Sequence, residues 1–78
     1  MTIGPGSPEA SILALINRRG QASAVEIGTA CRMTPGNVRG RLVMLESLRF
    51  ISGRYDNSTP PRRVYAITGE GERQVQAS

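Results

Sequence analysis

The chain has 78 residues, of which 38% are hydrophobic, and its ten basic and six acidic residues give a formal net charge of +4. This length supports one domain with one small core, because domains of about 100–150 residues are typical. The chain has no histidine and one cysteine, Cys31, so it lacks an intrachain disulfide, a recognised zinc ligand set and the usual nucleophile–base pairs. We therefore do not expect an enzyme, a cofactor or a metal site.

The sequence shows no segment suited to a membrane. The longest apolar run covers residues 12–16, whereas a membrane span needs about 20 residues. The first eight residues contain neither the basic nor the apolar region of a signal peptide. We expect a cytoplasmic, nucleoid-associated protein.

Positive charge is concentrated in the middle of the chain. Residues 32–63 contain seven arginines against Glu46 and Asp56, whereas the segments on either side are close to neutral. Such a basic stripe is typical of proteins that bind polyanions, since each neutralised phosphate releases counterions. A solvated basic face is the alternative that charge alone leaves open.

Residues 1–7 are predicted to be a flexible lead-in, followed by a helix over residues 8–19. Ser7 is suited to cap this helix, Pro8 to occupy its first position, and Gly20 to end it. Ile12, Leu15 and Ile16 have helical spacing. One face of this helix is therefore expected in the core.

Two more helix starts follow. Ser23 and Glu26 form the capping-box pattern, which predicts a short helix ending near residues 32–33. Thr34 and Pro35 then predict a cap and first position for a helix over residues 35–48. Its apolar stripe consists of Val38, Leu42, Leu45 and Leu48.

The pattern changes to strands after Arg49. Residues 50–55 and 63–67 are rich in aromatic and branched side chains, and the segment between them is rich in turn-forming residues. This arrangement predicts a β-hairpin. Residues 68–72 match the start of a final short helix, interrupted by two glycines. The domain is expected to cover residues 8–73, followed by a tail over residues 74–78.

Three helices and a hairpin predict a mainly α, α+β fold: a winged helix-turn-helix with a wing of two or three strands over residues 51–67. In such a fold the second helix of the helix-turn-helix presents its N-terminal residues to base edges in the major groove. The expected DNA contacts from this helix are Thr34, Gly36, Asn37, Arg39, Gly40 and Arg41. We expect Asn37 and Arg41 to read bases, with Arg39 nearer the DNA backbone. Arg54, Arg62 and Arg63 on the wing are expected to contact phosphates or a minor groove.

The stretch from Gln21 to Arg73 resembles winged-helix transcription regulators of the MarR, PadR and ArsR kind. "SAVEIGTACRMTPGNVRGRLVMLESLRFI" is similar to their short helix, turn, capped recognition helix and strand entry, and "RRVYAITGEGERQV" to their second wing strand and following helix start. Two features depart from the family. Arg49 stands where the family usually has a glycine, and the long dimerisation helices are missing.

The resemblance implies a sequence-specific double-stranded DNA-binding protein, a small transcriptional regulator of bacterial or phage type. A homodimer through the terminal segments is expected, because operators are usually read by symmetric dimers. The alternative is a winged helix that serves as a protein-interaction or assembly module, since a fold does not determine a function.

Overall fold

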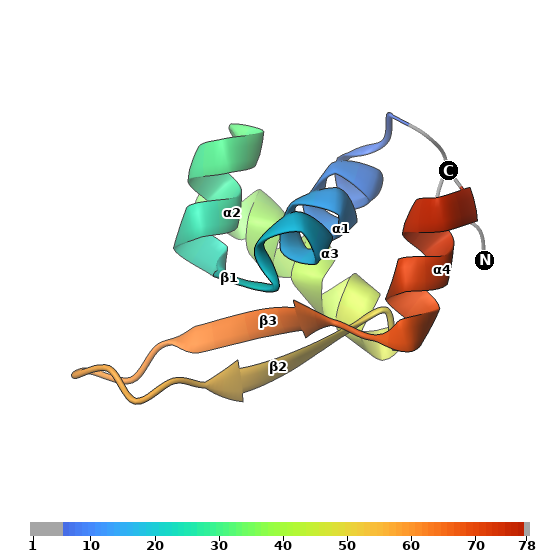
Figure 1. The fold of residues 1–78 in the computed structure, drawn as a ribbon. Coiled ribbons are helices and arrows are strands. Elements are labelled where there is room, and N and C mark those ends of the chain that lie inside the picture. The colour runs from blue at the N-terminus through green and yellow to red at the C-terminus, as the bar shows by residue number, and fades with distance from the viewer. Residues whose placement is uncertain (1–5, 78) are drawn as a thin grey trace.

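The computed structural model describes residues 6–77, in which four helices surround one face of a small sheet (Figure 1). The elements in chain order are α1 (Pro8–Arg19), β1 (Gln21–Ser23), α2 (Ala24–Cys31), α3 (Pro35–Ser47), β2 (Ile51–Tyr55), β3 (Arg63–Ile67) and α4 (Gly69–Ala77). The first five residues of the expected lead-in lie outside the described residues. No described helix is long and apolar enough to cross a membrane.

The predicted caps are present at the starts of α1 and α2. The Ser7 side chain accepts a hydrogen bond from the Ala10 amide at 3.2 Å. At α2 the box is complete: the Ser23 hydroxyl accepts from the Glu26 amide, and the Glu26 carboxylate accepts from the Ser23 amide at 3.0 Å. Gly20 ends α1 with a φ of 87°, in the region that glycine adopts without a steric penalty.

The sheet is antiparallel and has the order β1-β3-β2. Ile51 lies opposite Ile67 and Tyr55 opposite Arg63, which sets the register of the β2–β3 hairpin. Strand β1 pairs with the other edge of β3, with Ala22 opposite Tyr65. The predicted hairpin is confirmed, and the sheet has a third strand because β1 connects α1 to α2 along its edge.

One core joins the helices to the sheet. The apolar pattern of the sequence predicts one core of ten residues: Ile12, Leu15, Ile16, Ile27, Val38, Leu42, Leu45, Leu48, Ile51 and Ile67. Eight of them are buried, and Leu48 and Ile67 pack against these partly buried. Sequence periodicity missed four further buried apolar side chains: Leu13, Ala22, Phe50 and Val64. These four lie in or next to α1 and the sheet, where contacts between elements that are distant in sequence determine burial.

The residue that follows the end of α3, Arg49, has an unusual backbone conformation. Leu48 follows the helix, and Arg49 has a φ of 64°, the left-handed conformation that favours glycine. The Arg49 carbonyl accepts a 2.6 Å hydrogen bond from the Thr68 hydroxyl, and the Phe50 amide donates to the Leu45 carbonyl at 3.0 Å. The position where the family usually has glycine therefore keeps a glycine-like backbone.

Helix α4 is longer than the sequence indicates, since it includes residues 74–77 of the expected tail. Thr68 begins it by accepting a hydrogen bond from the Gly71 amide at 3.1 Å. Gly71 is buried. A Cβ there would overlap the Phe50 carbonyl oxygen and approach Ile67 Cγ1 to 2.7 Å. The glycine that weakened the helix prediction is required by close packing of α4 on the sheet.

We predict that Gly71→Ala destabilises the domain by at least about 1–3 kcal/mol, the usual cost of overpacking, because a backbone carbonyl cannot rotate away as a side chain does. Gly69→Ala is the matched control, since its Cβ would lie 4.0 Å from the nearest heavy atom, Arg73 Nη1. Urea denaturation measures both variants. Equal stability of the two would contradict the close approach.

A second prediction concerns the α3 stripe. Leu42 is 1% exposed and its neighbour Val43 is 63% exposed. Leu42→Ala should lower the free energy of unfolding by about 2–5 kcal/mol, because it leaves a cavity in the core. Val43→Ala should change it by less than about 0.5 kcal/mol. Thermal denaturation followed by circular dichroism distinguishes the two, and a small effect of Leu42→Ala would show that the stripe is not the core.

Candidate nucleic-acid interface

Helix α3 is held by a tight turn from α2. Arg32 adopts a left-handed conformation with a φ of 56°, and the Met33 amide donates to the Gly28 carbonyl at 2.9 Å. A Cβ on Gly28 would lie 3.3 Å from the Met33 carbonyl oxygen and 3.4 Å from Val38 Cγ2. The absence of a side chain at Gly28 therefore allows α2 and α3 to approach closely.

The start of α3 has the predicted cap, with Thr34 Oγ1 accepting from the Asn37 amide at 3.4 Å. Val38, Leu42 and Leu45 face the core. The exposed residues of the helix are Pro35, Gly36, Asn37, Arg39, Gly40, Val43 and Ser47. Five of the six residues predicted from this helix and its cap are thus exposed, and Arg41 is half-buried.

Gly36 and Gly40 are both exposed on α3. Each costs about 1 kcal/mol of helix stability relative to alanine. Neither has a positive φ, and a Cβ at either position would meet nothing within 4 Å. The packing of this chain therefore gives no reason for the two glycines.

Arg41 is directed toward α1 instead of outward. Its guanidinium forms an ion pair with Glu9 at 2.5 Å, and its Nε donates to Asn37 Oδ1 at 2.8 Å. The Arg41 and Glu9 side chains are 31% and 17% exposed. This contact, which the sequence analysis did not anticipate, joins α3 to the start of α1 and restrains Asn37.

The wing arginines are also engaged. Arg54 donates to the Gln21 side chain at 2.6 Å. Arg62 pairs with Asp56 at 2.8 Å and Arg63 with Glu46 of α3 at 2.7 Å. All three remain exposed. The structure therefore places each predicted wing arginine on the surface with a partner that orients it.

Asp56 organises the tip of the wing. Its Oδ1 accepts hydrogen bonds from the Ser58 hydroxyl at 2.6 Å, the Ser58 amide at 3.1 Å and the Arg62 amide at 3.2 Å. These bonds and the Arg62 guanidinium hold the pKa of Asp56 well below its usual range. Because the carboxylate is the form that is stabilised, this contribution is present at neutral pH and is lost as the pH falls.

Arg63 crosses the sheet toward α3. Its guanidinium lies 5.9 Å from the ring centre of Tyr55 and 5.7 Å from that of Tyr65, within the range of cation–π contacts. It also covers Gly53, where a Cβ would lie 2.6 Å from Arg63 Nε. The Glu46 carboxylate raises the pKa of Arg63. The wing is thereby attached to α3 by a charged side chain.

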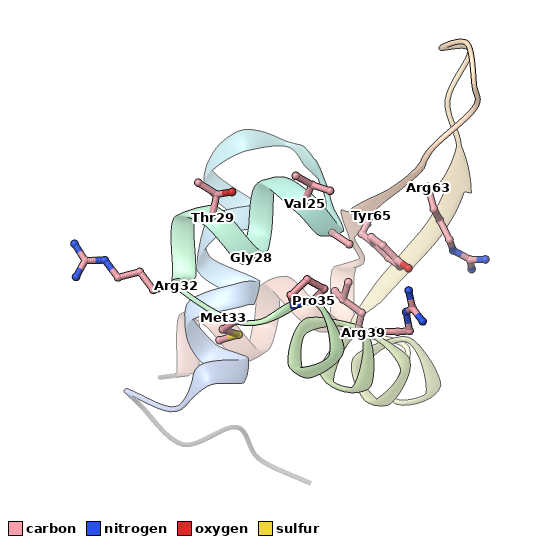
Figure 2. A pocket seen from close by; sticks show the side chains of 11 residues that line it. Val25, Gly28, Thr29, Arg32, Met33, Pro35, Arg39, Arg63 and Tyr65 are labelled. Atoms are coloured by element: carbon pink, nitrogen blue, oxygen red, sulfur yellow. The ribbon is translucent and has the colours of Figure 1, made fainter.

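A concave surface lies between α2, α3 and β3 (Figure 2), and the hollow that it encloses has a volume of about 710 Å³. Its wall is mainly apolar and includes Val25, Thr29 and Met33, none of which the sequence analysis selected. In Figure 2, Arg39 and Arg63 extend to the same region beside Tyr65, whereas Arg32 points away from the hollow.

Arg39 forms no ion pair with any residue in the part of the chain that the structure describes. Arg32 is exposed at the end of α2, and its membership of the basic stripe was the sequence signal that could have added it to the site. Among residues 6–77 no cluster of three potential metal ligands occurs. The surface thus offers cationic groups and apolar contact area.

Comparison with solved structures identifies the architecture. No protein-family model and no curated protein matches the sequence. Among solved structures, PadR of Bacillus subtilis in complex with operator DNA is similar with a TM-score of 0.78 at 19% identity, over 88% of this chain and 44% of that one. The fold is a winged helix.

Two further structures support this assignment. MepR of Staphylococcus aureus in complex with DNA has a TM-score of 0.80 at 23% identity, over 91% of this chain and 59% of that one. BpsR of Bordetella bronchiseptica, whose DNA binding is regulated by 6-hydroxynicotinic acid, has a TM-score of 0.82 at 18% identity, over 94% of this chain and 52% of that one. The chain thus spans about half the length of these regulators. The resemblance in fold expected from the sequence is confirmed.

We predict that Arg41→Ala lowers the free energy of unfolding by about 1 kcal/mol, the upper range for a surface ion pair, because it removes the contact between α1 and α3. Arg39→Ala, with no ion pair to lose, should leave it within about 0.5 kcal/mol of the wild type. Urea denaturation of both variants and of Glu9→Gln tests this. Arg41→Ala as stable as Arg39→Ala would show that the ion pair does not hold the helices together.

Proposed function

We propose that this protein binds double-stranded DNA sequence-specifically and acts as a small transcriptional regulator in the bacterial cytoplasm. The observation that carries the proposal is the surface of α3: an exposed helix face with arginines on both flanks, mounted on a winged helix. A major groove about 12 Å wide admits such a helix. PadR and MepR, which share this fold, are both found in complex with DNA, and this supports the proposal.

In this proposal α3 enters the major groove and its flanks meet the two phosphate backbones. Arg39 lies on the side of the concave surface, where a phosphate would supply the anionic partner that Arg39 does not have among the described residues. Asn37 and Arg41 lie on the side of α1. Because Arg41 is already bound to Glu9 and Asn37, we assign base reading on this flank to the two side chains as a unit.

The wing adds affinity that does not depend on sequence. The hairpin projects from the body of the molecule beside α2 (Figure 1), and Arg54, Arg62 and Arg63 are exposed along it. Phosphate contacts position a protein on the duplex without reading bases. The intramolecular partners of these arginines hold the side chains at the surface of the hairpin before DNA binds.

We propose further that two copies bind a two-fold symmetric operator. Helix α4 packs against α1, so the two terminal elements form one region that a second copy can use. Half-sites would then lie about 34–36 Å apart, one helical turn of DNA. Sizing of the complex between the protein and a selected duplex gives the stoichiometry.

The test is selection of binding sites from random DNA duplexes, followed by affinity measurements at several salt concentrations. A DNA-binding protein that engages six phosphates should lose about 10³-fold in affinity between 50 and 200 mM salt. Failure to enrich any sequence, with weak binding at every salt concentration, would instead favour the assembly module.

The proposal predicts a larger effect of Arg39→Ala than of Arg73→Ala. Both remove one positive charge, but Arg73 lies on α4, which is at the opposite end of the molecule from α2 (Figure 1) and contributes no residue to the concave surface. Arg39→Ala should weaken binding to selected and random duplexes alike and reduce the salt slope by about one, as expected for a lost phosphate contact. Fluorescence anisotropy titrations measure both. Equal effects of the two substitutions would mean that only net charge matters.

A further inference from the structure

The middle of the exposed face of α3 carries no charge. Gly36, Gly40, Val43 and Ser47 are all exposed, and their spacing of four, three and four residues aligns them along one side of the helix. Arg39 flanks this line on one side, and the Asn37–Arg41 pair on the other. The residues that would point deepest into a groove are therefore small or apolar.

Polar groups on this line are scarce as well. The Ser47 hydroxyl donates to the Met44 carbonyl at 2.7 Å, so its proton is already used within the helix. Gly36 and Gly40 have no side chains. The middle of this face therefore offers few side-chain groups that could form hydrogen bonds with bases.

Val43 is the large side chain at this central position. It is 63% exposed, one of three large hydrophobic residues that are exposed in the described chain, with Val25 and Tyr55. In the major groove the apolar group on a base edge is the C5 methyl of thymine. A valine in the middle of a helix that enters this groove matches that methyl and offers nothing to the donors and acceptors of a G·C pair.

The two glycines complement this role. Their cost to helix stability has no compensation inside the chain, since a Cβ at either position would be in open space. A bare helix surface does allow the backbone to approach base edges closely. The Val43 methyl groups then reach thymine without side chains at positions 36 and 40 holding the helix away.

We propose that Val43 is a specificity-determining residue that selects A·T pairs by contact with the C5 methyl of thymine, with Gly36 and Gly40 permitting the approach. This inference rests on the proposed DNA-binding function and goes beyond it by naming the group on the DNA that is read. Arg39, on one flank of this line, provides charge complementarity to the phosphates on that side of the groove.

The experiment replaces thymine with deoxyuridine. Deoxyuridine pairs with adenine in the same way and lacks only the methyl group. The probe is the duplex that the wild-type protein selects from random thymine-containing DNA, together with a copy in which thymines are replaced one at a time. Loss of one buried methyl should weaken wild-type binding about fourfold at the contacted position, at constant salt.

The variants assign this effect to one side chain. Val43→Ala should bind the thymine and deoxyuridine copies equally, whereas Arg73→Ala, a substitution on α4 away from the concave surface, should keep the fourfold difference. Gly40→Ala should raise the melting temperature by about 4–8 °C, because alanine favours the helix. It should also lower the preference for the selected duplex over random DNA about tenfold, the effect of a mismatched base pair.

The outcomes separate the two proposals. If the wild type selects a sequence but binds its thymine and deoxyuridine copies equally at every position, the inference about Val43 is overturned and sequence-specific binding stands. Val43→Ala that keeps the fourfold difference also overturns the inference. If the wild type selects no sequence, the proposed function itself fails.

Discussion

Burial of one face of α3 is the constraint on which the rest of the structure depends. Val38, Leu42 and Leu45 are at most 1% exposed, and they can be buried only if the helix lies with this face against the core. That requirement fixes which residues point outward. Because the apolar stripe faces the core, the residues on the opposite side of the helix, from Gly36 to Ser47, are exposed.

Charged contacts also link α3 to its neighbours. Glu9 holds Arg41 from the side of α1, and Glu46 of α3 holds Arg63 from the side of the wing. Both pairs join elements that are distant in sequence. They place the helix between α1 and the hairpin while their exposed portions leave positive groups at the surface. Each pair thus serves packing and surface electrostatics together.

The helical glycines of this chain have two different structural settings, close packing and open space, which the sequence does not distinguish. Gly28 and Gly71 lie against backbone atoms of neighbouring segments, so a Cβ at either would be tight or would clash. Gly36 and Gly40 face open space. All four lie in helices and carry the same penalty in propensity. Only the neighbours in three dimensions show that two serve the core and two leave a surface bare.

Local patterns in the sequence determined the helix starts, the hairpin and the winged-helix fold. Capping pairs such as Ser23 and Glu26, and the stripe of α3, act over three or four residues and therefore can be read directly. The exposed set from Thr34 to Gly40 followed from the same periodicity. Strand β1, the full length of α4 and the orientation of Arg41 were decided by tertiary structure. Each depends on a partner distant in sequence: β3 for β1, the Phe50 carbonyl beside Gly71 for α4, and Glu9, 32 residues away, for Arg41. The helical period of the sequence specifies which face of a helix is buried. The direction of a long, flexible side chain at the edge of that face depends on the charged groups that the fold places beside it.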